Sequence, residues 1–257
     1  MKVASFNSNG IRARLHIIEE WLKRHSPDVL CIQETKVQDQ DFPTRPFAEL
    51  AYHCTFRGQK SFNGVAIISK HAPTDVSFGF GDEDVKEEPR MMRAHIEGIP
   101  VVNTYVPQGT APDSERFQYK LKWFQRLRDY FSKHFEPSEP LLWMGDFNVA
   151  PEPIDVYDPV KLLGSVCFHP EEHKALSEVK SWGFVDVFRA HHPTEKAFTF
   201  WDYRIPHAFR HSLGWRLDHI WATQCLADKS TRAWIDAAPR QLEKPSDHTF
   251  MVAEFEI

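Results

Sequence analysis

Short apolar runs alternate with amphipathic stretches along the whole chain, and this alternation limits the folds available to it. The apolar, β-branched runs predict strands at residues 2–6, 29–32, 63–69, 101–105, 141–144, 217–222 and 250–255. Helical spacing of apolar residues predicts helices around residues 17–22, 113–131 and 171–182. Because strands and helices are mixed throughout, we expect a layered α/β or α+β domain with helices outside its sheets.

The length and composition of the chain fit one such domain. Its 257 residues, of which 42% are hydrophobic, can bury a large core, and no repeat or linker divides them, so we expect a single domain over residues 1–257. No apolar run approaches the roughly 20 residues needed to span a bilayer, so no membrane partner is expected. The first residues show no export or organelle signal, which predicts a cytoplasmic, nucleoid-associated protein.

Cysteine spacing and net charge bear on the kinds of site the chain can hold. The cysteines lie far apart without a C-x-x-C pair, which favours reduced, mostly buried thiols over disulfides or a zinc site at Cys31, Cys54, Cys167 and Cys225. The formal net charge of -5 argues mildly against a nucleic-acid partner. It does not exclude one, because a carboxylate-lined metal site adds negative charge inside a ring of Lys and Arg.

Polar clusters occur at the ends of several predicted strands. The first strand ends in N-S-N-G from Asn7, the second in Q-E-T-K from Gln33, and a later one in G-D-F-N from Gly145. Two D-H pairs, at Asp218 and Asp247, lie at the starts of further strands. Each cluster alone is commonly a turn or a solvated strand end. Five of them at strand ends predict one shared functional site.

The residue types in these clusters indicate chemistry on phosphate. Asn7, Glu34 and Asp247 offer only oxygen ligands, which suit a hard cation such as Mg²⁺, with Mn²⁺ as an alternative. Such a cation neutralises charge on a phosphate in the transition state, while a carboxylate can orient or deprotonate a water. His248 can pair with Asp218, which would favour the cationic form of its ring. The G-x-S-x-G motif of serine nucleophiles is absent.

Six motifs stand in a particular order along the chain: N-x-N-G, Q-E-T-K, N-T-Y-V-P-Q-G, G-D-F-N, G-W-R-L-D and S-D-H. In this order they resemble the exonuclease III family of abasic-site endonucleases, within the endonuclease/exonuclease/phosphatase superfamily, from Lys2 to Ile257. G-D-F-N and S-D-H are shared across the superfamily, whereas Q-E-T-K and G-W-R-L-D are typical of the abasic-site branch. The resemblance implies a four-layer α/β sandwich with two packed mixed β-sheets flanked by helices.

The resemblance also implies roles in metal binding and in the attack by water. Glu34 would be the principal metal ligand, helped by Asn7 and Asp247. Asp146 would position or activate the attacking water, and Asn148 would orient Asp146 and the phosphate. Whether one or two metal ions act stays open.

Further roles concern the phosphate and the leaving group. His248, paired with Asp218, would contact the phosphate, and Tyr105 would stabilise charge near the leaving oxygen. The family does not settle whether Asp146 or His248 is the base.

Substrate contacts follow from the same resemblance. Phe200, Trp215 and Leu217 match the family's apolar pocket for a flipped-out, base-free sugar, which leaves no room for a normal nucleotide. Other expected contacts are polar or basic, at Asn9, Arg12, Lys36 and Gln108, the last of which replaces an Asn of several members. Loop or helix-edge placement makes a wider set candidates for the DNA backbone, Arg14, Arg57, Lys60 and Lys120, but only Arg12 and Lys36 are expected to bind it.

Together these expectations describe a DNA repair nuclease. It would hydrolyse the phosphodiester 5′ to abasic sites in duplex DNA with Mg²⁺, and would act on 3′ ends as an exonuclease and phosphatase, as a monomer. One alternative is a relative that acts on RNA or a phosphorylated small molecule, against which G-W-R-L-D and the apolar pocket speak. The other is an inactive DNA-binding module, which the full set of ionisable residues disfavours.

Overall fold

Two six-stranded mixed β-sheets form the centre of the protein, in a computed structural model that describes residues 1–81 and 88–257. The first sheet has the strand order β11 (Ser230–Asp236), β12 (Phe250–Phe255), β1 (Lys2–Asn7), β2 (Val29–Gln33), β4 (Val65–Ser69) and β3 (His53–Arg57). The second has the order β5 (Thr74–Phe78), β6 (Met91–Ile96), β7 (Ile99–Tyr105), β8 (Leu142–Asp146), β10 (Asp218–Thr223) and β9 (Phe184–Asp186).

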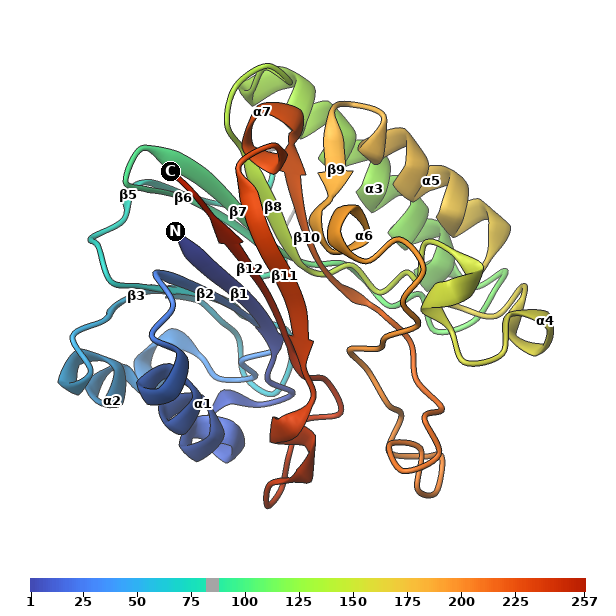
Figure 1. Ribbon diagram of the computed structural model, residues 1–257, viewed down its shortest axis with the longest axis horizontal. Coiled ribbons are helices and arrows are strands. Elements are labelled where there is room, and N and C mark those ends of the chain that lie inside the picture. Colours follow the sequence, from blue (N-terminus) through green and yellow to red (C-terminus); the bar gives the residue numbers. More distant parts are fainter. Residues whose placement is uncertain (82–87) are drawn as a thin grey trace.

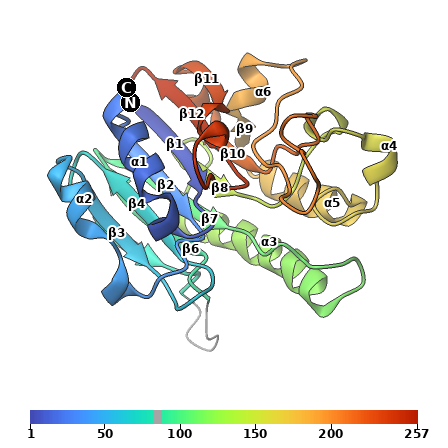
Figure 2. The same cartoon turned by 90° about the horizontal axis from the view of Figure 1, so that it is seen from below.

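Helices cover the outer faces of both sheets, so the molecule has four layers (Figure 1, Figure 2). The first sheet is covered by α1 (Ile11–His25) and α2 (Thr44–Glu49), and the second by α3 (Glu115–His134) and α5 (Pro170–Lys180). The remaining helical segments are short: η1 (Asp39–Asp41), η2 (Pro153–Asp155), α4 (Pro159–Leu162), α6 (Val187–His191), α7 (Gln224–Ala227) and η3 (Ala238–Gln241). The predicted four-layer α/β sandwich is therefore confirmed.

Three apolar layers hold this sandwich together. The layer between the sheets includes Cys31, Met144 and Met251, which come from β2, β8 and β12. A second layer packs β8 against α3 and α5, and a third packs β1 and β2 against α1. Strands such as β2 and β8 are buried at every position because they are covered on both faces. This double burial explains why their sequences are continuous apolar runs instead of alternating patterns.

The sequence patterns miss the strands at the edges of the sheets and the mostly buried β6, whose apolar positions are interrupted by Arg93 and His95. The apolar runs do not predict β3, β5, β6, β9 or β11, and β5 (T-D-V-S-F) is largely exposed. Such strands are stabilised by pairing with a neighbour, which a single stretch of sequence does not reveal. The predicted helix at residues 113–131 is found as α3, and the Ser114 hydroxyl accepts from the backbone N–H of Phe117 at its start. All four cysteines are free, as predicted.

Strand register brings the polar strand ends together at one edge. In the second sheet, Asp146 of β8 pairs with Tyr105 of the parallel β7 and with Asp218 of the antiparallel β10. In the first sheet, β1 and β2 are parallel and end side by side at Asn7 and Gln33. Since β12 runs antiparallel to β1, the residues just before β12 arrive at this same edge.

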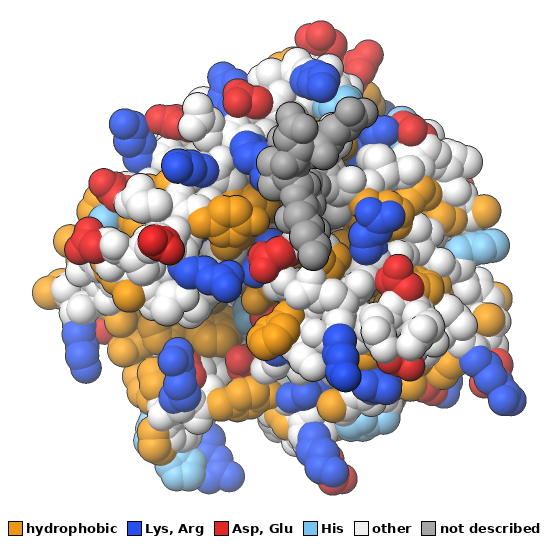
Figure 3. All heavy atoms as spheres, turned by 180° about the vertical axis from the view of Figure 1, so that it is seen from behind, with side chains coloured by type: hydrophobic (Ala, Val, Ile, Leu, Met, Phe, Trp, Pro, Cys, Tyr) orange, Lys and Arg blue, Asp and Glu red, His pale blue; other side chains and the backbone are white. Residues whose placement is uncertain are grey.

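One face of the molecule carries charges of both signs close together. Seen from behind, Lys and Arg side chains lie among Asp and Glu side chains, with apolar patches between them (Figure 3). The formal net charge of -5 is therefore not a uniform negative field on this face. Within the described residues, no helix combines the length and the apolar character needed to cross a bilayer.

Replacement of Gly145 by Ala should destabilise the fold strongly. Gly145 has φ +142° in β8, and an added Cβ would lie 2.0 Å from the carbonyl oxygen of Thr104 in β7. The combined strain and overlap predict a loss of about 3 kcal/mol or more in the free energy of unfolding, measured by urea denaturation. Gly98→Ala is the control, because Gly98 also has positive φ but no atom lies within 4 Å of the added Cβ, so about 1 kcal/mol is expected. Equal losses for the two variants would contradict the close approach of β7 and β8.

Candidate active site

An amide from the first sheet contacts carboxylates from both sheets. The Nδ2 of Asn7, at the end of β1, donates to Glu34 Oε1 at 2.8 Å and to Asp146 Oδ2 at 2.8 Å. Asn7 and Asp146 are both almost completely buried. The amide therefore joins the ends of β2 and β8 across the sandwich.

Glu34 is held as a charged carboxylate at the edge of the first sheet. It follows β2 with φ +51°, a left-handed conformation that turns the chain away from the strand. Lys36 Nζ lies 2.7 Å from Glu34 Oε2. Burial alone would raise the pKa of Glu34, but the charge and hydrogen bond of Lys36 and the amide of Asn7 lower it below its ordinary value.

The N-x-N-G turn connects this edge to the segment before β12. Asn9 Nδ2 donates to Asp247 Oδ1 at 3.0 Å, and Lys36 Nζ donates to Asn9 Oδ1. Arg14 Nη1 donates to the carbonyl oxygen of Asn9 at 2.8 Å, so this arginine supports the turn. Asp247 thus contacts Asn9, and its predicted role as a metal ligand stays a prediction.

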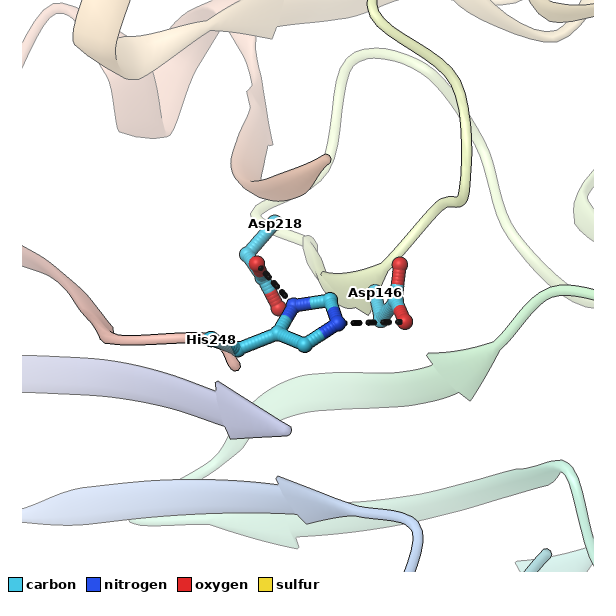
Figure 4. Close-up of side chains that lie close together, drawn as sticks. All are labelled: Asp146, Asp218 and His248. Atoms are coloured by element: carbon cyan, nitrogen blue, oxygen red, sulfur yellow. Dashed lines mark hydrogen bonds and ion pairs between the residues drawn. The ribbon is translucent and has the colours of Figure 1, made fainter. Parts of the chain in front are cut away.

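Asp218, His248 and Asp146 lie in a row, with the imidazole between the two carboxylates (Figure 4). His248 Nδ1 is 2.7 Å from Asp218 Oδ2, and its Nε2 is 3.9 Å from Asp146 Oδ2. Burial opposes the charged ring, but Asp218 and Asp146 outweigh it and raise the pKa of His248 to about 10. The ring is therefore an imidazolium at neutral pH, and Nε2 faces Asp146 with a proton.

Asp146 has a proton affinity unusual for a carboxylate. Burial is the largest cause, and the negative charges of Asp218 and Glu34 add to it, while His248 and Asn7 act in the opposite direction. The net effect raises the pKa of Asp146 to about 7. A group with this pKa can both take up and release a proton near neutral pH, which suits acid–base catalysis.

Asn148 and Tyr105 complete the polar surroundings of Asp146. The backbone N–H of Asn148 donates to Asp146 Oδ1 at 2.8 Å, and its Nδ2 donates to Asp146 Oδ2 at 3.2 Å. Burial, followed by the charges of Glu34 and Asp146, raises the pKa of Tyr105 well above its ordinary value, so its hydroxyl keeps its proton. The guanidinium of Arg90 lies 4.7 Å from the centre of the Tyr105 ring and fixes one face of it.

A cavity of about 430 Å³ opens beside these groups. Phe200, Trp215 and Leu217 line one side of it, and the Phe200 ring lies 4.8 Å from His248 and 5.8 Å from Trp215. Most of the predicted contact residues line the rest, namely Asn9, Glu34, Lys36, Tyr105, Gln108, Asn148, Asp247 and His248. The cavity is thus lined by polar groups, His248 among them, and by an apolar side that contacts His248 through Phe200.

Several predicted residues lie outside the cavity lining. Arg12 is exposed on α1, where a contact with a long substrate stays a prediction. Arg57 stacks over Phe78, with 4.2 Å to the ring centre. The interpretation of Lys120 as a candidate for DNA contact is wrong, because its side chain is completely buried and ion-paired with Glu172.

The sequence motifs do not reveal the groups behind the apolar side of the cavity, which is formed by Phe200, Trp215 and Leu217 and is called the apolar wall below. Arg216 lies between Trp215 and Leu217 in sequence but is fully buried, and it forms ion pairs with Asp155 and Asp186 at 2.7 and 2.8 Å. Alternation of side chains along extended backbone places this arginine behind the wall. An arginine between two apolar residues is a weak signal for this arrangement, and the partners are distant in sequence.

The acidic cluster can hold a metal ion. Among the described residues, ligand atoms of Asp146, Asp218 and His248 all lie within 4.8 Å of one another. The His248 ring can bind a cation only after it loses a proton, whereas Glu34, which accepts from the same Asn7 amide as Asp146, adds a carboxylate. Asp218 Oδ1 is buried without a hydrogen-bond partner, and the neighbouring carboxylates help raise the pKa of Asp146. A hard cation would relieve both conditions, and the oxygen atoms present are the ligands that it prefers.

Comparison with known proteins gives matches over the whole chain. The family model described as the endonuclease/exonuclease/phosphatase family matches residues 4–248. Exodeoxyribonuclease III of Haemophilus influenzae is 36% identical over 267 residues, which cover 99% of this chain and 100% of the relative. An AP endonuclease structure from Archaeoglobus fulgidus has a TM-score of 0.97 and 48% identity, and the 3′ phosphatase NExo from Neisseria, bound to a product DNA hairpin, has a TM-score of 0.95 and 33% identity. Each of these two matches covers 100% of this chain and 100% of the compared structure's chain.

Replacement of Asp218 by Asn should lower the pKa of His248. Asp218 is the strongest of the groups that raise this pKa, so its loss should lower the value of about 10 by roughly 1 to 3 pH units. Titration of the His248 ring by NMR in metal-free protein measures the change. Asp202→Asn, which removes a carboxylate from the rim of the same cavity, is the control and should change the value less. An unaltered His248 titration in Asp218→Asn would contradict the pairing.

Proposed function

Because this chain belongs to the exonuclease III family of AP endonucleases, within the endonuclease/exonuclease/phosphatase family, we infer that it is a DNA repair nuclease that cuts at abasic sites and cleans 3′ ends. The observation that carries this proposal is the row of Asp146, His248 and Asp218 beside a cavity with one apolar side. We further propose Mg²⁺ as its cation and a single-domain monomer as its acting form.

The geometry of the row supports a division of roles in phosphodiester hydrolysis. We propose Asp146 as the base that takes a proton from the attacking water, because its carboxylate is oriented by Asn7 and lies beside the His248 cation. His248, with a pKa of about 10, stays cationic and stabilises the phosphate. Asn148 fixes the Asp146 carboxylate through two hydrogen bonds. Tyr105, which keeps its proton, donates to charge near the leaving oxygen.

We propose Glu34 as the principal ligand of the metal ion, helped by Asn7 and Asp247. Glu34 is held charged by Lys36 and Asn7, and its carboxylate faces the cavity. A bound Mg²⁺ would neutralise charge on the phosphate in the transition state. Lys36 and Asn9 also face the cavity and would contact the DNA backbone there.

The apolar side of the cavity supports selection of a base-free sugar. Backbone hydrogen bonds between Phe200 and Trp215, at 2.9 Å in both directions, hold these two residues side by side. Leu217 is almost completely buried next to them. An apolar wall of this kind can pack against a flipped-out deoxyribose without a base, whereas a hydrogen-bonding pocket would be needed to read a base edge.

Cleavage of a duplex with one synthetic abasic site tests the proposed function. We expect a metal-dependent cut immediately 5′ of the lesion, and removal of the metal by EDTA should abolish it. Asp146→Asn should lower the rate on the order of a hundredfold or more, because the amide cannot act as a base. The readout is product length on a denaturing gel, beside an undamaged duplex.

Two results would contradict this proposal. A cut that persists in EDTA would rule out the metal-dependent mechanism. Degradation of RNA, or phosphate release from a small molecule, without a cut at the lesion would assign the chain to a different activity within the superfamily.

Replacement of Trp215 by Ala should separate the two DNA activities. The residue lies on the apolar wall and makes no hydrogen bond from its side chain to the row of Asp146 and His248. Loss of the wall should therefore slow cleavage at abasic sites by on the order of tenfold more than removal of a 3′ phosphate. Rates on the two substrates, each at saturating DNA, give the ratio. The proposed pocket would be wrong if both activities fell equally.

A further inference from the structure

A lysine from the outer helix layer reaches the two loops that carry site residues. Lys120 lies on α3, yet its side chain is completely buried. Its ammonium group donates to the carbonyl oxygens of Asn148 at 2.7 Å and Gln108 at 3.1 Å, and to Glu172 Oε1. These are the loops that follow β8 and β7, so one side chain contacts both of them.

The three contacts use the full donor capacity of the ammonium group, which has three N–H bonds. Glu172 balances the charge, and its other oxygen accepts from the backbone N–H of His169 at 3.1 Å, at the start of α5. A buried charge is tolerated only when it is paired and hydrogen-bonded in this way. The lysine therefore fixes three segments relative to one another: the two loops and the first turn of α5.

The Asn148 backbone is held at both of its polar groups. Its φ is +50°, a left-handed conformation that Asn adopts more readily than most other non-glycine residues. Its backbone N–H and side-chain Nδ2 both donate to Asp146. A rotation of the Asn148 backbone would move both of these donors away from Asp146. Lys120 opposes such a rotation, because it binds the carbonyl oxygen of the same residue.

We propose that Lys120 is a positioning residue for the nuclease reaction. It holds the Asn148 carbonyl so that both Asn148 donors stay on Asp146, and it holds the Gln108 carbonyl so that Gln108 keeps its place in the cavity wall. Lys120 does not line the cavity, so it acts through these loops and touches neither DNA nor the reacting atoms. This inference rests on the proposed role of Asn148.

The double variant Lys120→Met/Glu172→Gln tests the inference without leaving a buried charge. Met keeps the length and apolar stem of Lys120, and Gln keeps an oxygen for the His169 N–H. We expect the single-turnover rate at saturating DNA and metal to fall by on the order of tenfold to a hundredfold, as for a small misplacement of a catalytic group.

A matched control separates positioning from a general loss of stability. Leu226→Ala removes a buried side chain in α7, which follows β10 at the end of that strand opposite Asp218, so it should lower the Tm without moving the loops. Rates are compared well below the Tm of each variant. A Lys120→Met/Glu172→Gln rate equal to that of Leu226→Ala would overturn the inference.

A mutant cycle with Asn148→Ala asks whether Lys120 acts through Asn148. If it does, the triple variant should be little slower than Asn148→Ala alone, because the group being positioned is already absent. The rate loss of the triple variant could instead equal the product of the losses of Lys120→Met/Glu172→Gln and of Asn148→Ala. That result would show an independent structural effect and would overturn the inference, while the proposed function would stand. Full activity of Asn148→Ala would instead refute the role of Asn148 in the proposed function, and with it this inference.

Discussion

The hydrogen bonds of the Asn7 amide are the contact on which the site depends most directly. One nitrogen donates to Glu34 in the first sheet and to Asp146 in the second, at 2.8 Å each. Without a donor between them, two carboxylates brought together by sheet packing would repel each other in a medium of low dielectric. The amide offsets this repulsion by donating to both carboxylates where the strands end. Lys36 and His248 balance the charge on either side.

The reactivity of the site follows from its position within the core. Asp146 ends a strand whose other residues are all buried, and this burial is the main reason that its pKa is raised to about 7. His248 is equally buried, but Asp218 lies 2.7 Å away and keeps its ring charged. The same sandwich that excludes water from the apolar layers therefore places a carboxylate of raised pKa and a charged imidazole side by side.

Buried ion pairs outside the reaction hold the loops around the cavity. Lys120 and Glu172 connect the loops after β7 and β8 to α5, and Arg216 connects the apolar wall to Asp155 and Asp186. Such pairs add little net stability compared with apolar packing, but removal of one partner is costly. Their effect here is on conformation: they fix backbone segments that have no regular secondary structure of their own.

The amino-acid sequence alone predicts most of the buried strands, the main helices and the residue types of the site, because double burial produces continuous apolar runs and because oxygen ligands at strand ends indicate phosphate chemistry. It also placed Asp218 with His248, through their chemical complementarity. The half-exposed strands, such as β5, and the buried state of Lys120 and Arg216 became visible in the folded protein alone. Strand pairing, burial and proton affinity depend on neighbours distant in sequence: Asn7 and Asp146 are 139 residues apart, yet their hydrogen bond fixes the site.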